Sequence, residues 1–114
     1  MDVPGTLAVS VHSWITGAKE EAAAAAFAER YRQRYKIPLQ TYAPYAYDAT
    51  MVFASAMQQA NSTDPAKFLP ALAKINYHGV TGDIAFDPSG DLHDAALTLY
   101  TYRDGKQVKL EVVR

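Results

Sequence analysis

Apolar residues near the N-terminus alternate with small residues in the pattern of a β-strand. Over residues 6–11, Leu7, Val9 and Val11 share one face, and the opposite face carries only threonine, alanine and serine. Side chains alternate between the two faces of a strand, and small residues on the second face are typical of a strand that is covered on both sides. The segment therefore predicts a strand within a covered sheet.

A helix is predicted over residues 18–36. Apolar or aromatic side chains recur there at every fourth position: Ala23, Phe27, Tyr31 and Tyr35. Acidic residues near the start and basic residues near the end suit the helix dipole. The basic residues permit two interpretations, an anion-binding site or a solvated helix end. The charge balance of the whole chain favours the second.

Residues 45–60 predict a second helix, which begins just after Pro44. Alanine, methionine, valine and phenylalanine cover almost its whole circumference. A helix with so little polar face is buried on several sides or is shared with another chain. We therefore expect this buried helix at the centre of the fold.

A third helix is expected over residues 65–74, with Asp64 as its cap and Pro65 in its first turn. Because Pro70 lacks a backbone donor, we expect a distorted turn or a break at that position.

The last third of the chain predicts β-structure. Residues 80–86 form a β-favouring run that leads into a turn at residues 87–91. Residues 96–113 predict a hairpin around Asp104 and Gly105. With the helices, these strands indicate an α/β chain that no linker divides.

Composition narrows the possible partners. The chain has 114 residues, of which 49% are hydrophobic, with 11 Lys+Arg, 12 Asp+Glu and no cysteine. Binding to a phosphate backbone needs clustered, uncompensated basic residues, so we expect no nucleic-acid partner. The absence of cysteine excludes disulfides and thiolate chemistry. We expect no bilayer span, because no apolar run approaches about 20 residues, and no secretion signal in this chain.

Neither a metal site nor a catalytic motif is predicted. His12, His78 and His93 are isolated in the sequence and lack the spacing of a zinc motif. The acidic turn at residues 87–91 does not continue as an EF-hand, because Leu92 occupies the position of the required glycine. Nucleophile-elbow, phosphate-loop and dinucleotide motifs are missing. We therefore expect a protein that is not an enzyme and has no cofactor.

Aromatic residues gather around the start of the second helix. Tyr42, Tyr45 and Tyr47 lie there, and Trp14 follows the first strand. Such rings either pack in the core and at its rim or form a wall for a small apolar or amino-acid ligand. The residue types alone leave both interpretations open.

Two segments resemble the type I periplasmic solute-binding proteins, and more closely the leucine/isoleucine/valine-binding family that serves ABC importers. Residues 42–49 read YAPYAYDA and continue as an apolar helix to residue 60, and residues 77–91 read YHGVTGDIAFDPSGD. The order of the other elements agrees, so the resemblance covers essentially the whole chain. It implies an α/β fold over residues 1–114 as a single partial domain: part of a type I periplasmic-binding-protein fold, with a Rossmann-like lobe and a C-terminal β-hairpin.

The resemblance implies that the chain is a fragment. Family members have two α/β lobes with the ligand between them, and this sequence is similar to their C-terminal third. Residues 18–90 would belong mainly to one lobe, and residues 6–11 and 96–113 to the other. The upstream residues that usually hold the α-carboxylate and α-ammonium of the ligand are missing from this chain.

The implied function is that of an ABC-transporter substrate-binding protein for branched-chain or related amino acids. The intact parent would bind an amino acid between its lobes, interact with an ABC permease and be located in the periplasm. The resemblance implies Tyr42 as an aromatic wall of the ligand site, with Trp14 and Tyr45 on its hinge side.

A chain of this kind exposes apolar faces that the rest of the parent would cover, so we expect it to self-associate. An alternative interpretation is a free-standing small oligomeric module for interaction or sensing, derived from the same fold. A small α/β enzyme is a third interpretation.

Overall fold

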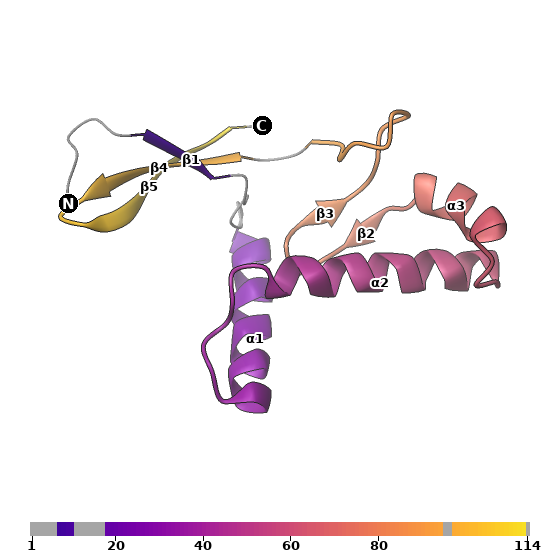
Figure 1. Cartoon of the computed structure of the whole chain (residues 1–114), viewed down its shortest axis with the longest axis horizontal. Coiled ribbons are helices and arrows are strands. Elements are labelled where there is room, and N and C mark those ends of the chain that lie inside the picture. The colour runs from indigo at the N-terminus through magenta and orange to yellow at the C-terminus, as the bar shows by residue number, and fades with distance from the viewer. Residues whose placement is uncertain (1–6, 11–17, 95–96, 114) are drawn as a thin grey trace. The chain divides into compact units, whose positions relative to one another are not determined.

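The computed structural model describes residues 7–10, 18–94 and 97–113, and the chain forms two compact units (Figure 1). One unit contains residues Met1–Thr16 and Asp94–Arg114, and the other contains Gly17–His93. This differs from the single partial domain that we expected over residues 1–114. The division follows the lobe assignment that the resemblance implied, because the first strand and the C-terminal hairpin separate from the segment between them.

The first unit is a three-stranded antiparallel sheet with the order β1-β4-β5. Its strands are β1 (Leu7–Ser10), β4 (Leu97–Arg103) and β5 (Lys106–Val113). Asp104 and Gly105 join β4 to β5 with φ angles of 52° and 71°, the left-handed conformations that a tight hairpin turn requires. A register shift between Leu99 and Tyr100 bends the ladder, as a β-bulge does.

The second unit contains three helices within the described residues: α1 (Ala18–Tyr35), α2 (Ala43–Ala60) and α3 (Pro65–Ala73). Helix α2 ends at Asn61, whose left-handed conformation lets the next backbone groups bond back to the last turn. Asp64 caps α3, because its side chain accepts a hydrogen bond from the Ala66 N–H at 3.0 Å.

Pro70 lies inside α3, and the helix continues through it to Ala73. The break that we expected there is therefore absent. The φ angle of proline is compatible with a helix, and the missing donor removes one hydrogen bond, to the carbonyl of Ala66. Since Ala66 is exposed, water can satisfy that carbonyl.

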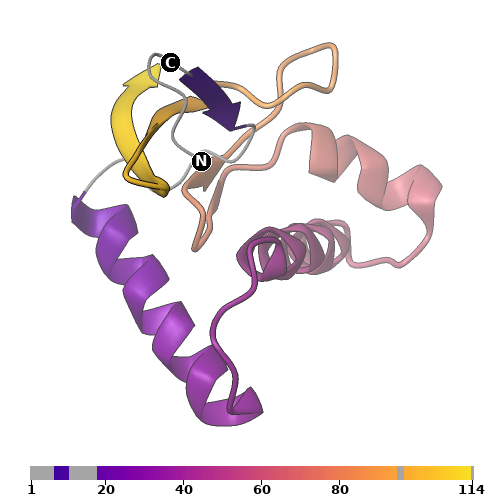
Figure 2. The ribbon, with the colours of Figure 1, turned by 60° about the vertical axis from the view of Figure 1, so that its left-hand side comes forward.

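The core of the second unit lies between α2, α3 and the segment that follows α3. Val52, Ala56 and Ile75 are buried at its centre. Partly buried side chains pack around them: Ala71, Leu72, Tyr77, Ile84 and Phe86. Figure 2 looks along α2 and shows α3 and the β2–β3 pair on the same side of this helix.

Only one stripe of α2 is buried. Its members recur at every fourth position: Pro44, Asp48, Val52 and Ala56. We expected this helix to be buried on several sides or shared with another chain; within the described part of the chain it is buried along one stripe, and sharing with another chain stays a prediction. The remaining faces of α2 keep exposed apolar residues, although the rings of Tyr47 and Phe53 pair there with those of Phe27 and Phe68.

The strand expected over residues 80–86 is much shorter in the structure, where only Asp83–Ile84 within that range forms a strand. Two short strands are present instead, β2 (Tyr77–His78) and β3 (Asp83–Ile84), which pair antiparallel. Residues 79–82 form the turn between them, closed by a hydrogen bond of 2.9 Å from the Gly79 N–H to the Gly82 carbonyl. The β-branched residues Val80 and Thr81 lie in this turn because their backbone donors bond to α2, as described below.

Candidate functional site

The N-terminal end of α2 carries two of the three predicted ligand residues. Tyr42 occupies the position just before the helix and is 68% exposed. Tyr45 follows in the first turn and is half-buried. Trp14 lies outside the described residues. The structure thus brings Tyr42 and Tyr45 to one end of one helix, and their role as ligand contacts stays a prediction.

Tyr47, the third tyrosine of this cluster, takes part in packing between helices. Its ring lies 4.9 Å from that of Phe27, which is buried on α1. The series continues along α1, with ring centroids 6.3 Å apart from Phe27 to Tyr31 and 4.8 Å apart from Tyr31 to Tyr35. These separations suit favourable aromatic pairs, so the apolar stripe of α1 joins the start of α2 through rings.

Asp48 is the most buried polar residue described, with 1% of its surface exposed. Its carboxylate accepts three hydrogen bonds from the turn between β2 and β3. The Val80 N–H donates at 3.0 Å, and Thr81 donates through its N–H at 2.8 Å and its hydroxyl at 2.5 Å. A buried carboxylate is stable only when such donors satisfy it. Asp48 therefore connects the two segments that carried the resemblance, residues 42–60 and 77–91.

Gly79 lets the turn approach this carboxylate. A Cβ atom added to Gly79 would lie 2.6 Å from the Asp48 Cγ and 2.9 Å from its Oδ1, closer than real Cβ contacts allow. The absence of a side chain at position 79 is thus a condition for the hydrogen bonds of Val80 and Thr81.

Tyr77 lies beside this connection. Burial raises the pKa of the Tyr77 phenol above its ordinary value, and the nearby charges of Asp48 and, to a smaller extent, Tyr47 raise the pKa further. A neutral phenol is the form that suits a position next to a carboxylate.

Sequence reasoning missed Asp48, although a signal was present. Asp48 is the only charged residue between Ala43 and Ala60, in a helix that is otherwise apolar or neutral. A lone carboxylate in such a helix is either solvated or satisfied by donors from elsewhere. The donors lie 32 and 33 positions away along the chain, so the sequence could not identify them.

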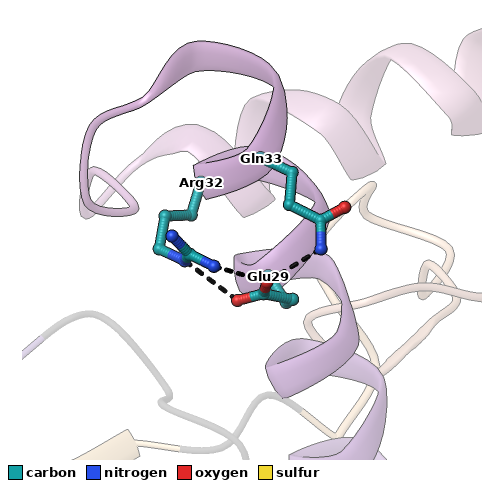
Figure 3. Close-up of polar contacts among 3 residues, drawn as sticks. All are labelled: Glu29, Arg32 and Gln33. Atoms are coloured by element: carbon teal, nitrogen blue, oxygen red, sulfur yellow. Dashed lines mark hydrogen bonds and ion pairs between the residues drawn. The ribbon is translucent and has the colours of Figure 1, made fainter.

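The basic end of α1 is a solvated helix end within the described residues. Figure 3 shows Glu29 accepting hydrogen bonds from Arg32, at 2.7 and 3.0 Å, and from Gln33 at 2.8 Å. These bonds lower the pKa of the Glu29 carboxyl, and Glu29 in turn raises the pKa of Arg32. Arg30 and Arg34 line a shallow open hollow with Gln33 and Tyr35. Exposed pairs of this kind contribute little to stability.

No group of three or more histidine, aspartate or glutamate side chains within residues 7–10, 18–94 and 97–113 could hold a metal ion. In the same ranges, no helix combines the length and apolar character that crossing a membrane requires.

Comparison with known proteins shows to which class of protein this chain belongs. Solved structures that superpose on this chain include type I periplasmic binding proteins. Residues 5–107 match the family described as "Periplasmic binding protein". The chain belongs to this family.

Several relatives are named for the amino acids that they bind. A leucine-, isoleucine-, valine-, threonine- and alanine-binding protein of Pseudomonas aeruginosa is 29% identical over 77 residues. A leucine-binding protein of Thermotoga maritima superposes with a TM-score of 0.72 and 26% identity. A branched-chain amino-acid transporter substrate-binding protein of Streptococcus pneumoniae, in complex with isoleucine, gives a TM-score of 0.72 and 28% identity.

The chain spans only part of each relative. The match to the Pseudomonas protein covers 68% of this chain and 21% of that protein. The superpositions cover 96% of this chain and 31% of the Thermotoga protein, and 94% and 30% for the Streptococcus protein.

Proposed function

We propose that this chain forms the C-terminal third of a solute-binding protein for branched-chain or related amino acids. The observation that supports the proposal is the family match over residues 5–107, together with relatives named for binding leucine and isoleucine. In the intact parent, the ligand would lie between two lobes that close around it, and the closed protein would deliver it to an ABC permease in the periplasm. The role is binding without catalysis, and it needs no cofactor.

In this proposal, the N-terminal end of α2 supplies an aromatic wall. The exposed ring of Tyr42 would cover an aliphatic side chain of the ligand, and Tyr45 and Trp14 would line the hinge side. Apolar walls provide most of the contact area in such pockets, while a few polar groups orient the ligand. The polar groups for the α-carboxylate and α-ammonium would come from the other two-thirds of the parent.

The isolated chain is therefore expected not to bind branched-chain amino acids, whereas a chimera should bind them. The chimera replaces the matched third of the Streptococcus pneumoniae protein with this chain. Isothermal titration calorimetry should detect isoleucine binding by the chimera and none by the isolated chain. Tyr42→Ala in the chimera should weaken binding about tenfold, which corresponds to roughly 1.4 kcal/mol.

Tyr35→Ala is the matched control for this measurement, since Tyr35 is an exposed tyrosine at the far end of α1. It should leave the affinity unchanged. A folded chimera that binds no branched-chain amino acid would contradict the proposal, as would micromolar binding by the isolated chain.

We also propose that the isolated chain self-associates. Large apolar side chains are exposed on several elements, among them Leu69 on α3 and Tyr102 and Leu110 on the hairpin. Size-exclusion chromatography with light scattering should give a mass above the 12.5 kDa of one chain. A stable monomer that does not enhance the fluorescence of the dye ANS would rule this out. The relatives give no support to the alternative of a free-standing oligomeric module.

A further inference from the structure

The chain separates its charges into two segments. Residues 30–47 contain no acidic residue, and their four basic residues lie in or directly after the last turns of α1: Arg30, Arg32, Arg34 and Lys36. We call these four residues the basic end of α1. Residues 75–102 contain no lysine or arginine, and their four acidic residues are Asp83, Asp87, Asp91 and Asp94. The net charge of -1 for the whole chain therefore combines two segments of opposite sign.

The charge at the basic end of α1 exceeds what the helix itself requires. A helix dipole places only about half an elementary charge at the C-terminal end. The neighbouring Glu29 carboxylate already accepts hydrogen bonds from Arg32 and Gln33 (Figure 3). Arg30 and Arg34 are exposed and form no ion pair within the described part of the chain. They lie one turn apart, where like charges repel, so an anion placed between them would relieve this repulsion.

The surface beside these two arginines suits a carboxylate. The shallow hollow there is lined by side chains that can each donate a hydrogen bond, and none of them is acidic: Arg30, Gln33, Arg34 and Tyr35. The planar fork of a guanidinium group matches a carboxylate through two parallel hydrogen bonds. The hollow therefore fits an acidic side chain better than a basic or an apolar one.

The acidic turn at residues 87–91 presents such a side chain. Asp87 holds the turn, because its Oδ1 atom accepts hydrogen bonds from the N–H groups of Ser89 and Asp91 at 2.8 and 3.0 Å. Asp91 contributes its backbone N–H and carbonyl groups to the turn, and the residue is exposed. A hydrogen-bonded turn thus places the Asp91 carboxylate on the surface, in a segment without lysine or arginine.

We infer that the basic end of α1 docks onto the acidic turn at residues 87–91 of a second copy of this chain. Charge complementarity argues for this occupant, because each copy carries one segment of each sign. Within one copy, no ion pair joins the two segments in the described residues. Two copies related by a two-fold axis would form the contact twice. This contact is distinct from the apolar side chains that support the self-association proposed above.

Sedimentation equilibrium of this chain at rising salt tests the contact. Salt screens exposed charges, so the dissociation constant of the self-association should rise about tenfold between roughly 50 and 500 mM sodium chloride. At low salt, the double variant Arg30→Glu/Arg34→Glu should weaken the association by about tenfold or more. Lys67→Glu/Lys74→Glu is the matched control, because both lysines are exposed and lie in or directly after α3. It should change the dissociation constant less than about twofold.

A charge exchange between copies makes the test specific. Asp91→Arg alone should weaken the association about as much as the double arginine variant, whereas Glu111→Arg, an exposed control on β5, should not. Mixing the Arg30→Glu/Arg34→Glu protein with the Asp91→Arg protein should restore the association, because both contacts then join opposite charges. Restoration by mixing also shows that neither variant had misfolded.

A chain that is monomeric at low salt would overturn the inference, as would a mixture of folded variants that associates no better than each variant alone. Circular dichroism of each variant verifies the fold. Association that is equally strong at high salt and in every variant would support the apolar self-association and refute the charged contact. Isoleucine binding by the chimera does not depend on this contact, so the calorimetry described above decides the proposed function separately.

Discussion

Asp48→Ala should destabilise the second unit by about 3–5 kcal/mol, because hydrogen bonds to a charged group contribute roughly 1.5–3 kcal/mol each. The substitution removes the acceptor for the N–H groups of Val80 and Thr81 and for the Thr81 hydroxyl, in a position where Asp48 is almost fully buried. Urea unfolding followed by far-ultraviolet circular dichroism, at one fixed protein concentration, should show the loss as a lower midpoint.

Two further variants make this measurement specific. Asp64→Ala is the matched control, because Asp64 caps α3 with one exposed hydrogen bond, and its loss should cost only about 1 kcal/mol. Asp48→Asn keeps the shape of the side chain but removes its charge, so it should lower the raised pKa of Tyr77 toward the ordinary value. The tyrosinate absorbance in an alkaline titration reports this pKa. Equal destabilisation by Asp48→Ala and Asp64→Ala would contradict the role assigned to Asp48.

The direction of the Tyr77 pKa shift determines how this residue affects the stability of the fold as the solution becomes alkaline. A group whose pKa is raised in the folded state stabilises the fold below its unfolded pKa, and this contribution is lost as the pH rises through the folded pKa. The Tyr77 contribution is therefore complete at neutral pH and declines only above about pH 10.

Gly79→Ala is expected to destabilise the second unit by about 2–3 kcal/mol, within the range typical of overpacked sites. The added Cβ would meet the Asp48 carboxylate, with the Cγ atom only 2.6 Å away. Because the φ angle of Gly79 is not positive, alanine carries no backbone strain there, and the clash alone causes the loss. The same urea unfolding experiment measures it.

A double-mutant cycle tests this cause directly. When Asp48 is already alanine, the obstructing carboxylate is gone, and Gly79→Ala should cost less than about 0.5 kcal/mol more, so the two effects should be strongly non-additive. Gly90→Ala is the control, since nothing lies within 4 Å of its added Cβ and only its φ of +89° opposes a side chain. That strain should cost roughly 1–2 kcal/mol, and it should add normally to Asp48→Ala. Additive effects of Gly79→Ala and Asp48→Ala would show that the two residues do not constrain each other.

The positions of the long helices could be predicted from the sequence because their signals are local. The aromatic repeat of Phe27, Tyr31 and Tyr35 occurs within α1, and Pro44 and Asp64 lie at the starts of α2 and α3. Helix caps, prolines in the first turn and a repeat of about four residues are signals that lie within one or two turns of the helix itself. Tyr42 and Tyr45 could be recognised as neighbours for the same reason, since they are close along the chain.

The segment at residues 79–82 shows where local reasoning fails. The β-branched residues Val80 and Thr81 favour a strand by propensity, yet their N–H groups donate to Asp48 instead of to a neighbouring strand. The acceptor lies on α2, more than 30 positions earlier, so the turn depends on a contact that the segment itself does not contain.

By itself, the sequence determined where the helices and the hairpin begin and end and which family the chain resembles, because these properties depend on neighbouring residues and on motifs of fixed spacing. The tertiary structure decided which stripe of α2 is buried and that Asp48 connects this helix to the turn at residues 79–82. A helix that is apolar around its whole circumference gives no preferred direction for burial. The buried carboxylate of Asp48 fixes this direction, because its hydrogen bonds come from the turn at residues 79–82.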